Sequence, residues 1–315
     1  MRIVFLDSST IELAGDIDYQ AIKELGEFEK FASTSPSEVA SRLTGADVAI
    51  TNKVVLSAEA LRSTQLKHAA VVATGVNNID LDAAKGLGVS VSNVPGYAAH
   101  SVPQHIFALI LNLATGAHRY ISDVQSGEWN LSETFTLLKY NTFELAGKTI
   151  GIIGFGTIGR ATARIAEAFG MRVMMHRKSG MPLDGYKCSS LEGIYSNADI
   201  ISLSLPLTDS NRYMIDGAVL RQMKPNSILI NTARGPLVNQ SDLAEALNNN
   251  MIAGAGIDVL DTEPPTEGNP LFSAKNCIIT PHSAWSTREA RQRLVDEVAL
   301  NIKAFSNGEG RNLVT

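Results

Sequence analysis

The sequence contains few cysteines, and the two that it has show no pattern typical of a cross-link or a metal site. Cys188 and Cys277 lie far apart and outside any CxxC spacing, and no HExxH motif occurs. We therefore expect neither a disulfide framework nor a bound metal. So little cysteine suits a reducing compartment, and we expect the protein in the cytoplasm.

Long apolar runs and an excess of basic residues are also absent. The longest apolar run, at residues 106–111, is far too short to cross a bilayer. The first seven residues resemble a β-strand rather than a signal peptide, because polar residues follow at once without a small-residue cleavage site. The formal net charge of −5 argues against a surface for nucleic acid or an anionic membrane. We expect neither partner.

The chain is long enough for two domains, since 315 residues exceed the usual size of a single core. In residues 3–93, short apolar runs alternate with amphipathic stretches, a βαβ rhythm that predicts a parallel sheet. Val94-Pro95-Gly96 interrupts this rhythm, and a second series begins at Thr149. A last amphipathic helix, which begins at Ser286-Thr287-Arg288-Glu289, is expected to return to the first domain. The predicted strands are residues 3–6, 48–51, 69–73, 89–92, 172–175, 199–203, 227–231, 252–259 and 277–280, and the predicted helices include 19–25, 37–43, 81–87, 217–223 and 242–247.

The segment between the two series predicts a long helix and an unusual extension. Apolar residues at helical spacing favour one helix over residues 98–118. Residues 127–143 are irregular and polar, yet they include Trp129 and Phe135. We interpret them as an extension that grips a second subunit, with a surface loop as the alternative.

The centre of the chain carries a glycine motif, GFGTIG at residues 154–159, between an apolar strand and an amphipathic helix. In such a motif Gly154 permits a tight turn, Gly156 lets a pyrophosphate approach the backbone, and Gly159 lets the helix pack close to the strand. A glycine-rich loop alone is weak support for a nucleotide site. The strand before it and the helix after it favour dinucleotide binding over a plain loop.

The residues after the next predicted strand bear on the choice of cofactor. An acidic residue about 20 positions beyond the motif typically binds the ribose of NAD. Here Arg177 occupies that region, followed by Lys178 and Ser179, which could together hold a 2′-phosphate. The sequence therefore favours NADP(H) over NAD(H), with a solvated basic turn as the alternative. We include His176 with these three among the candidate cofactor-binding residues.

Three residues that could carry chemistry follow three separate apolar strands. Arg234, Glu263 and His282 each lie just beyond a predicted strand of the second series. Ligands of an open parallel sheet bind outside the carboxyl ends of its strands, so the three could converge beside the glycine motif. Reduction of a 2-oxo acid by hydride transfer needs a proton donor and a cation for the carboxylate, which histidine and arginine supply. The glutamate would orient the imidazole and favour its protonated form. Each residue alone could instead be structural.

Taken together, these motifs resemble the D-2-hydroxyacid dehydrogenase family over nearly the whole chain. The resemblance is carried by the glycine motif, NTARG at residues 231–235, GIDV at 256–259, EP at 263–264 and PH at 281–282. TNKV at 51–54, ATGVNNID at 73–80 and HSAW at 282–285 resemble its glycerate dehydrogenase (hydroxypyruvate reductase) branch. Two positions depart from the family pattern: Arg177 replaces the acidic residue of NAD-preferring members, and Gln104 stands where many members have glutamate.

The resemblance implies an α/β protein with two doubly wound parallel sheets. A Rossmann dinucleotide-binding domain would span residues 97–286, and a flavodoxin-like substrate domain would comprise residues 1–96 and 287–315. It further implies a homodimer, and a cleft between the two domains that closes on the substrate. His282 would be the acid/base, Glu263 its partner, and Arg234 the ligand of the substrate's carboxylate and carbonyl. The implied cofactor contacts are Thr157, Ile158, Leu205, Pro206, Thr232, Ala233 and Asp258, and the other implied substrate contacts are Lys53, Thr74, Gly75 and Trp285.

We therefore predict an NAD(P)-dependent oxidoreductase that reduces small 2-oxo acids, with hydroxypyruvate and glyoxylate as the expected substrates. A reductase for bulkier acids such as phenylpyruvate is the nearest alternative. A dinucleotide-sensing protein without catalytic activity is the alternative from another class, because the family includes corepressors of this fold. The absence of a disordered extension in this sequence argues against that alternative.

Overall fold

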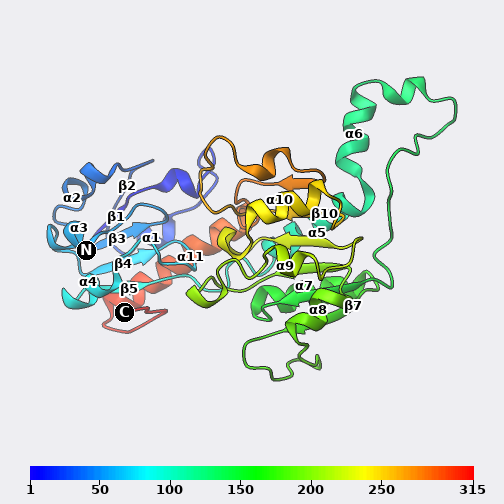
Figure 1. Cartoon of the computed structure of the whole chain (residues 1–315). Helices are drawn as coiled ribbons and strands as arrows, with labels where there is room; N and C mark the ends of the chain where they lie inside the picture. The colour runs from blue at the N-terminus through cyan, green and yellow to red at the C-terminus, as the bar shows by residue number, and fades with distance from the viewer. The chain divides into compact units, whose positions relative to one another are not determined.

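The computed structural model describes all 315 residues, and they form two compact units. The first unit comprises Met1–Ala98 and Trp285–Thr315, and the second is Ala99–Ala284. Each unit is an α/β layer structure with its own parallel sheet (Figure 1). These divisions lie two residues from each of the predicted domain boundaries.

The first unit is built on a five-stranded parallel sheet in the order β2-β1-β3-β4-β5. This is the flavodoxin-like order, in which the chain reverses direction across the sheet between β1 and β3. The strands are β1 (Arg2–Phe5), β2 (Glu27–Lys30), β3 (Val48–Thr51), β4 (His68–Val71) and β5 (Ser90–Ser92). The helices are α1 (Gln20–Lys23), α2 (Val39–Arg42), α3 (Ala58–Arg62), α4 (Leu81–Gly86) and α11 (Arg288–Ser306).

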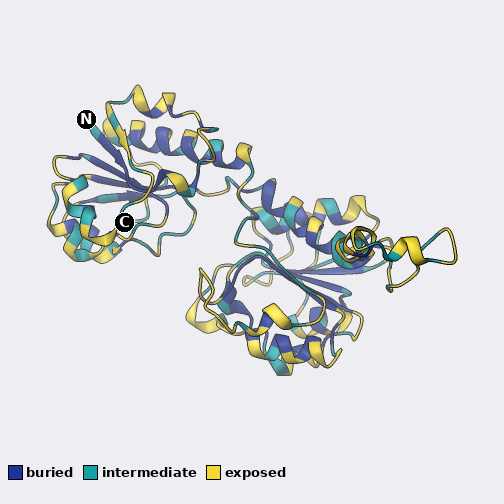
Figure 2. Ribbon diagram, turned by 90° about the horizontal axis from the view of Figure 1, so that it is seen from above, coloured by how far each residue is buried: buried dark blue, intermediate teal, exposed yellow.

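Alternating side chains of the first sheet feed two separate cores, as the pleat of a strand requires. Ile3 and Phe5 of β1 pack in the core that includes residues of α1 and α11, whereas Val4 packs in the core that includes residues of α2, α3 and α4. In Figure 2 the buried strands accordingly lie between helices whose buried sides face them. The final helix thus belongs to the first unit, where Thr287 caps its N-terminus by accepting a hydrogen bond from the backbone N–H of Ala290.

The C-terminal residues complete the outer edge of this sheet. Leu313 forms an antiparallel bridge with Ser92 of β5, and the Val314 N–H donates to the Val91 carbonyl at 2.9 Å. An edge strand left alone would present unpaired backbone groups to solvent. Leu313 and Val314 therefore cover the outer edge of β5.

The second unit is built on a six-stranded parallel sheet in the order β11-β10-β9-β8-β6-β7. A single parallel bridge from Met175 to Cys188 extends it beyond β7, which gives the Rossmann arrangement of strands around the reversal between β6 and β8. The strands are β6 (Thr149–Ile153), β7 (Arg172–His176), β8 (Ile200–Leu203), β9 (Ile228–Asn231), β10 (Gly254–Ile257) and β11 (Cys277–Ile279). The helices are α5 (Ser101–Thr115), α6 (Ala117–Gln125), α7 (Thr157–Ala168), α8 (Leu191–Asn197), α9 (Gly217–Leu220) and α10 (Gln240–Asn248).

Two expectations about the elements were wrong. Strand β2 was missed because its sequence, EFEK, buries only part of Phe28 and carries charges that suit an exposed sheet edge. The single helix expected over residues 98–118 ends at Thr115, because Gly116 adopts a left-handed conformation with φ of 63° and a new helix, α6, begins behind it.

Helix α6 opens a projecting segment, residues 117–143, which we call the arm (Figure 1). Its shape is fixed by polar contacts rather than by a core. The Tyr140 hydroxyl donates to Asp123 at 2.7 Å, Lys139 pairs with the same carboxylate at 3.1 Å, and the Tyr120 hydroxyl accepts from the Tyr140 N–H at 3.1 Å. These bonds hold the pKa of Asp123 below its usual range, chiefly through Tyr140. The arm is therefore held in shape by contacts among its own polar side chains.

One buried histidine in the first unit makes its stability depend on pH. His68 is 1% exposed, its ring nitrogens lie 2.8 and 2.9 Å from the hydroxyls of Ser90 and Ser92, and its ring stacks on Phe305 at 4.7 Å. Burial lowers the pKa of His68 from 6.5 to about 4. As the pH falls, the unfolded chain protonates His68 before the folded chain does. The stability that neutral, buried His68 contributes is therefore complete above pH 6.5 and is lost as the pH falls from there towards about 4.

We predict that urea unfolding will show a free energy of unfolding roughly 2 kcal/mol lower at about pH 5 than at about pH 7.5 from this group alone. His68→Asn should remove that part of the pH dependence, whereas His118→Asn, at an exposed position, should keep it. Equal pH dependence in the two variants would show that His68 is not the group responsible.

Candidate active site

The glycine motif forms a tight turn that brings three strand ends together. Gly154 has φ of 96°, and a Cβ built on it would lie 2.3 Å from the Ser204 carbonyl oxygen, so only glycine fits. The Gly154 N–H donates to the His176 carbonyl at 2.9 Å, and the Ser204 N–H donates to the Ile153 carbonyl at 2.8 Å. The residues that follow β6, β7 and β8 are therefore neighbours at one edge of the sheet.

The N-terminus of α7 is open in the way that a bound pyrophosphate requires. Gly156 is its N-cap, no side chain caps the helix, and a Cβ added to Gly156 would have no protein atom within 4 Å. The first N–H groups of the helix, at Thr157 and Ile158, are thus accessible to an anion and carry the positive end of the helix dipole. A Cβ on Gly159, by contrast, would lie 2.2 Å from the Gly154 carbonyl oxygen, so this glycine sets the close approach of helix and turn. These features fit a dinucleotide.

The predicted 2′-phosphate residues follow β7 directly. His176 is committed elsewhere, since its Nδ1 lies 2.9 Å from the Ser189 carbonyl oxygen. Arg177 is half-buried and Lys178 is exposed, and neither cation has an ion pair or a side-chain hydrogen bond within the chain. Ser179 accepts only a long bond, 3.4 Å, from the Met181 N–H. Two unpaired cations therefore border the glycine turn, where Leu205 and Pro206 follow β8.

Arg234 lies on a turn whose backbone is fixed by an asparagine and a glycine. The Asn231 side chain donates to the Arg234 carbonyl at 2.9 Å and accepts from the Ala233 N–H at 3.0 Å, which leaves Thr232 at the bend. A Cβ on Gly235 would lie 2.1 Å from the Leu260 carbonyl, so this turn packs directly against the backbone that leads to Glu263. The guanidinium is exposed and contacts only the Ala233 carbonyl, at 2.7 Å.

Glu263 and His282 form the pair that the sequence predicted. Nδ1 of His282 lies 2.6 Å from Oε2 of Glu263, and the two side chains are 31% and 34% exposed. The other carboxylate oxygen, Oε1, accepts the Leu260 N–H at 2.8 Å, which fixes the glutamate in turn. With Nδ1 engaged, Nε2 of the imidazole remains for a ligand. This is the geometry of an acid/base held by a carboxylate.

The turn that carries His282 is held by the buried Asp258. Its carboxylate is 1% exposed and accepts the N–H groups of Ser283 at 2.9 Å and Ala284 at 3.0 Å. The His282 N–H donates to the Asp258 carbonyl at 2.8 Å, and His282 has a left-handed backbone with φ of 51°. That conformation is uncommon outside glycine, and the hydrogen bonds to Asp258 stabilise it. A contact of Asp258 with the nicotinamide stays a prediction.

Sequence reasoning missed two residues that support this carboxylate. The Thr280 hydroxyl donates to Asp258 at 2.5 Å, and Nε2 of His105 lies 3.0 Å from the same hydroxyl. The sequence did offer a signal for Thr280, because this residue directly follows β11 just as the other candidate residues follow their strands. No local pattern identifies His105, because it lies on α5, 175 positions away in the chain.

The remaining predicted residues belong to the first unit. Lys53 is exposed after β3, and Thr74 and Gly75 follow β4, where their backbone N–H groups donate no hydrogen bond within the chain. Trp285 packs partly buried against the core that contains β1 and α11, with its ring 6.3 Å from that of Tyr97. Their contact with a substrate stays a prediction.

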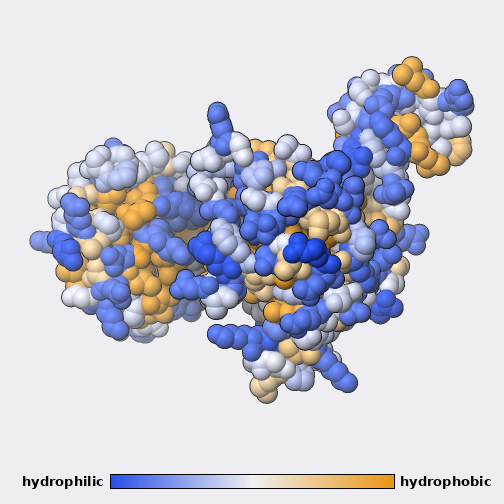
Figure 3. Space-filling model, in the orientation of Figure 1, coloured by the Kyte–Doolittle hydropathy of each residue, from blue (hydrophilic) through white to orange (hydrophobic).

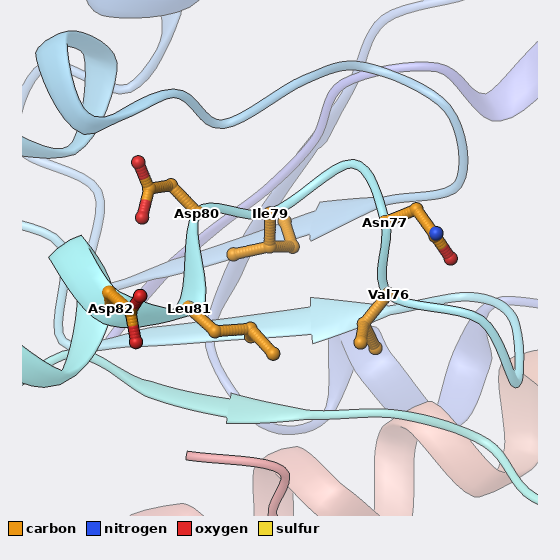
Figure 4. A pocket seen from close by; sticks show the side chains of 6 residues that line it. All are labelled: Val76, Asn77, Ile79, Asp80, Leu81 and Asp82. Carbon is orange, nitrogen blue, oxygen red and sulfur yellow. The ribbon is translucent and has the colours of Figure 1, made fainter. Parts of the chain in front are cut away.

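An open pocket of about 500 Å³ lies just beyond Gly75, between Val76 and Asp82 (Figure 4). Its polar lining includes the carboxylates of Asp80 and Asp82, and Asp80 already accepts the Ala83 N–H at 2.9 Å as the cap of α4. Carboxylates repel an anionic acid, so this pocket does not suit the predicted substrate.

No group of three or more His, Cys, Asp or Glu side chains is arranged to hold a metal ion. None of the helices combines the length and hydrophobicity that a membrane span requires.

Comparison with known proteins agrees with the fold and the motifs. Residues 107–284 match the NAD-binding domain of D-isomer specific 2-hydroxyacid dehydrogenases. The chain is 40% identical to a glycerate dehydrogenase of Methylorubrum extorquens, over 99% of this chain and 98% of that protein. It is 37% identical to a hydroxypyruvate reductase of Blautia hydrogenotrophica, over 100% and 99%. Among solved structures, an acyclic imino acid reductase in complex with NADPH and D-Arg superposes with a TM-score of 0.89 at 30% identity, over the full length of both chains.

The matched family domain spans the glycine turn, Arg234 and the Glu263–His282 pair, and the relatives align over essentially the whole chain. The sequence prediction of the family, of the two-sheet α/β fold and of an oxidoreductase acting on small 2-oxo acids is thereby confirmed. The chain belongs to the D-isomer specific 2-hydroxyacid dehydrogenase family.

Proposed function

We propose that the protein is a hydroxypyruvate and glyoxylate reductase, or D-glycerate dehydrogenase in the reverse direction, with NADP(H) as its preferred cofactor. The observation that carries this proposal is the 2.6 Å contact between Nδ1 of His282 and the Glu263 carboxylate, which forms an acid/base pair. The exposed Arg234 supplies the cation that a 2-oxo acid requires. The names of the glycerate dehydrogenase and hydroxypyruvate reductase relatives support the choice of substrate.

In this proposal the residues divide the work between proton transfer and anion binding. A bound nicotinamide cofactor would supply the hydride for the substrate's C2. His282 donates the proton from Nε2 to the carbonyl oxygen, and Glu263 stabilises the imidazolium before the transfer. Arg234 binds the carboxylate and polarises the carbonyl through its fork of N–H donors. Lys53, Thr74, Gly75 and Trp285 remain the predicted substrate contacts of the first unit.

The cofactor preference rests on the two unpaired cations after β7. Arg177 and Lys178 leave their donors available at the place where NAD-preferring members carry an acid. A 2′-phosphate would satisfy these donors, whereas a ribose hydroxyl would leave them without an anionic partner. The NADPH complex of the imino acid reductase shows that a protein of this fold accepts that cofactor.

We also propose that the protein forms a homodimer through the arm. Large apolar side chains are exposed there: Phe135 is 92% exposed, Leu138 90% and Leu131 83%. Figure 3 shows hydrophobic surface on this projecting segment. Large exposed apolar side chains gathered on one segment typically mark a protein interface.

Enzyme assays can test the proposed substrate and cofactor. Purified protein should reduce hydroxypyruvate and glyoxylate faster than pyruvate or phenylpyruvate, and faster with NADPH than with NADH. Arg177→Leu should raise the KM for NADPH roughly 10- to 100-fold, because a charge-assisted hydrogen bond is lost, and should leave the KM for NADH nearly unchanged. Arg172→Leu, at the start of the strand that Arg177 follows, is the matched control.

Initial rates with every pair of acid and cofactor provide the measurement. A preference for NADH would exclude the role of Arg177 but not the catalytic residues. Activity confined to phenylpyruvate would reject the proposed substrates, and a complete lack of activity would favour a sensing protein.

Substitutions of the acid/base pair separate catalysis from binding. His282→Asn should lower kcat by about 100- to 10,000-fold, the usual contribution of a general acid, and leave the affinity for NADPH within about twofold. Glu263→Gln keeps a hydrogen bond to Nδ1 but removes the charge, so its loss of kcat should be smaller. Stopped-flow turnover and fluorescence titration of NADPH measure the two quantities. Full turnover in His282→Asn would remove this residue from the mechanism.

Substitutions in the arm test the proposed assembly. The double variant Phe135→Asp/Leu138→Asp should shift the protein from dimer to monomer in sedimentation velocity, because it places charge in the proposed interface. The exposure of both side chains means that the fold of the arm should survive, which circular dichroism can verify. Leu13→Asp, at a site 73% exposed in the first unit, should remain a dimer. An unaltered dimer in the double variant would place the interface elsewhere.

A further inference from the structure

Asp7 is a buried carboxylate that the proposed mechanism does not use. It lies two residues beyond β1 and is 3% exposed. Its Oδ1 accepts the Asn52 N–H at 2.9 Å, and its Oδ2 accepts the N–H groups of Lys53 at 2.6 Å and Val54 at 3.0 Å. An ionised carboxylate is an acceptor only, so three converging N–H donors match it. This one side chain therefore fixes three consecutive residues of the turn after β3.

The turn lies where an open parallel sheet binds its ligands. Strands β1 and β3 are neighbours, and the strand order reverses between them. At such a reversal the connections leave on opposite faces, which opens a crevice at the carboxyl ends of the strands. The residues that follow β1 and β3 are thus placed at the edge of the first sheet where a ligand is expected.

Further contacts hold the same turn from both sides. The Asn52 side chain donates to the Thr10 hydroxyl at 3.0 Å. The Val54 carbonyl accepts from the Thr51 hydroxyl at 2.9 Å and from Asn78 at 3.1 Å. The backbone of the turn therefore has little freedom, whereas the Lys53 side chain stays exposed and forms no hydrogen bond or ion pair within the chain.

The way in which Asp7 is satisfied explains why this lysine stays unpaired. An aspartate so close to a lysine would ordinarily attract its ammonium group. Here both carboxylate oxygens accept backbone N–H groups, and the exposed Lys53 side chain forms no ion pair with them. The turn thus presents an exposed ammonium group on a backbone of little freedom, and such a group can pair with a small anion.

We propose that Asp7 is a positioning residue for substrate binding, which fixes the turn of residues 52–54 so that Lys53 contacts the anionic 2-oxo acid. This inference rests on the proposed function and names the residue that prepares one of its predicted substrate contacts. It assigns no chemical step to Asp7. Loss of the carboxylate should weaken substrate binding rather than slow the reaction of bound substrate.

The test is a double-mutant cycle of Asp7→Asn and Lys53→Met, measured by steady-state reduction of hydroxypyruvate with saturating NADPH. Each single variant should raise the KM for hydroxypyruvate about tenfold, with kcat and the affinity for NADPH within about twofold. Because Asp7 acts through Lys53, the double variant should show no more than the effect of Lys53→Met alone. Additive effects, or an unchanged KM in Asp7→Asn, would overturn the inference.

A matched control separates positioning from general stability. Asp47 also accepts a backbone N–H, from Arg2 at 2.9 Å, but it precedes β3 at the opposite end of the strand. Asp47→Asn should therefore leave the KM for hydroxypyruvate unchanged even where it lowers the melting temperature. An equal rise in KM for Asp47→Asn would mean that Asp7 acts only through stability.

A milder variant covers the case in which Asp7→Asn does not fold. Thr10→Val removes the hydroxyl that accepts from Asn52 and leaves the buried charge intact. It should raise the same KM about two- to fivefold without changing kcat, and an unchanged KM in this variant would overturn the inference.

The wild-type protein is assayed in parallel, so that failure of the proposed function can be told from failure of this inference. If the wild type reduces no 2-oxo acid, the proposed function fails and the inference with it. An active wild type with unaffected variants rejects the inference alone.

Discussion

The geometry of the active site depends on how one buried carboxylate is satisfied. Asp258 accepts two backbone N–H groups and a hydroxyl from residues 280–284, and its own carbonyl accepts the N–H of His282. The left-handed backbone of the histidine costs free energy, which these bonds offset. The pairing with Glu263 can form because this turn already faces the glutamate. Backbone donors, rather than contacts between catalytic side chains, therefore set the position of the acid/base.

The same device occurs in the first unit, where Asp7 binds the turn after β3. In both units an aspartate follows a strand of a parallel sheet and accepts N–H groups from the turn beyond a strand end. Such turns leave N–H groups without partners, and a carboxylate that only accepts can satisfy several of them at once. Short polar side chains thus give loops at the sheet edge a rigidity that apolar packing cannot provide there.

The sequence predicted the parts of this structure that depend on local patterns. Apolar runs identified most strands of both parallel sheets, and the glycine motif identified the strand–turn–helix unit at residues 149–168. Strand β2 escaped because a charged edge strand has no apolar run, and the break at Gly116 was hidden by apolar spacing that continues from α5 into α6. The contacts of His105 with Thr280 and of Asp7 with Lys53 join residues far apart in the chain, so only the folded arrangement of strands reveals them.

The division of the first unit across the chain has a consequence for its synthesis. Its sheet is made by residues up to position 98, but the helix that buries Ile3 and Phe5, α11, begins only at Arg288. The whole second unit leaves the ribosome in between and can fold during that interval, because domains generally fold as units during translation. Until the last residues emerge, the nascent first unit exposes one apolar face and the open edge of β5. It is this unit, the one without the nucleotide motif, that most needs protection from aggregation while the chain is being made.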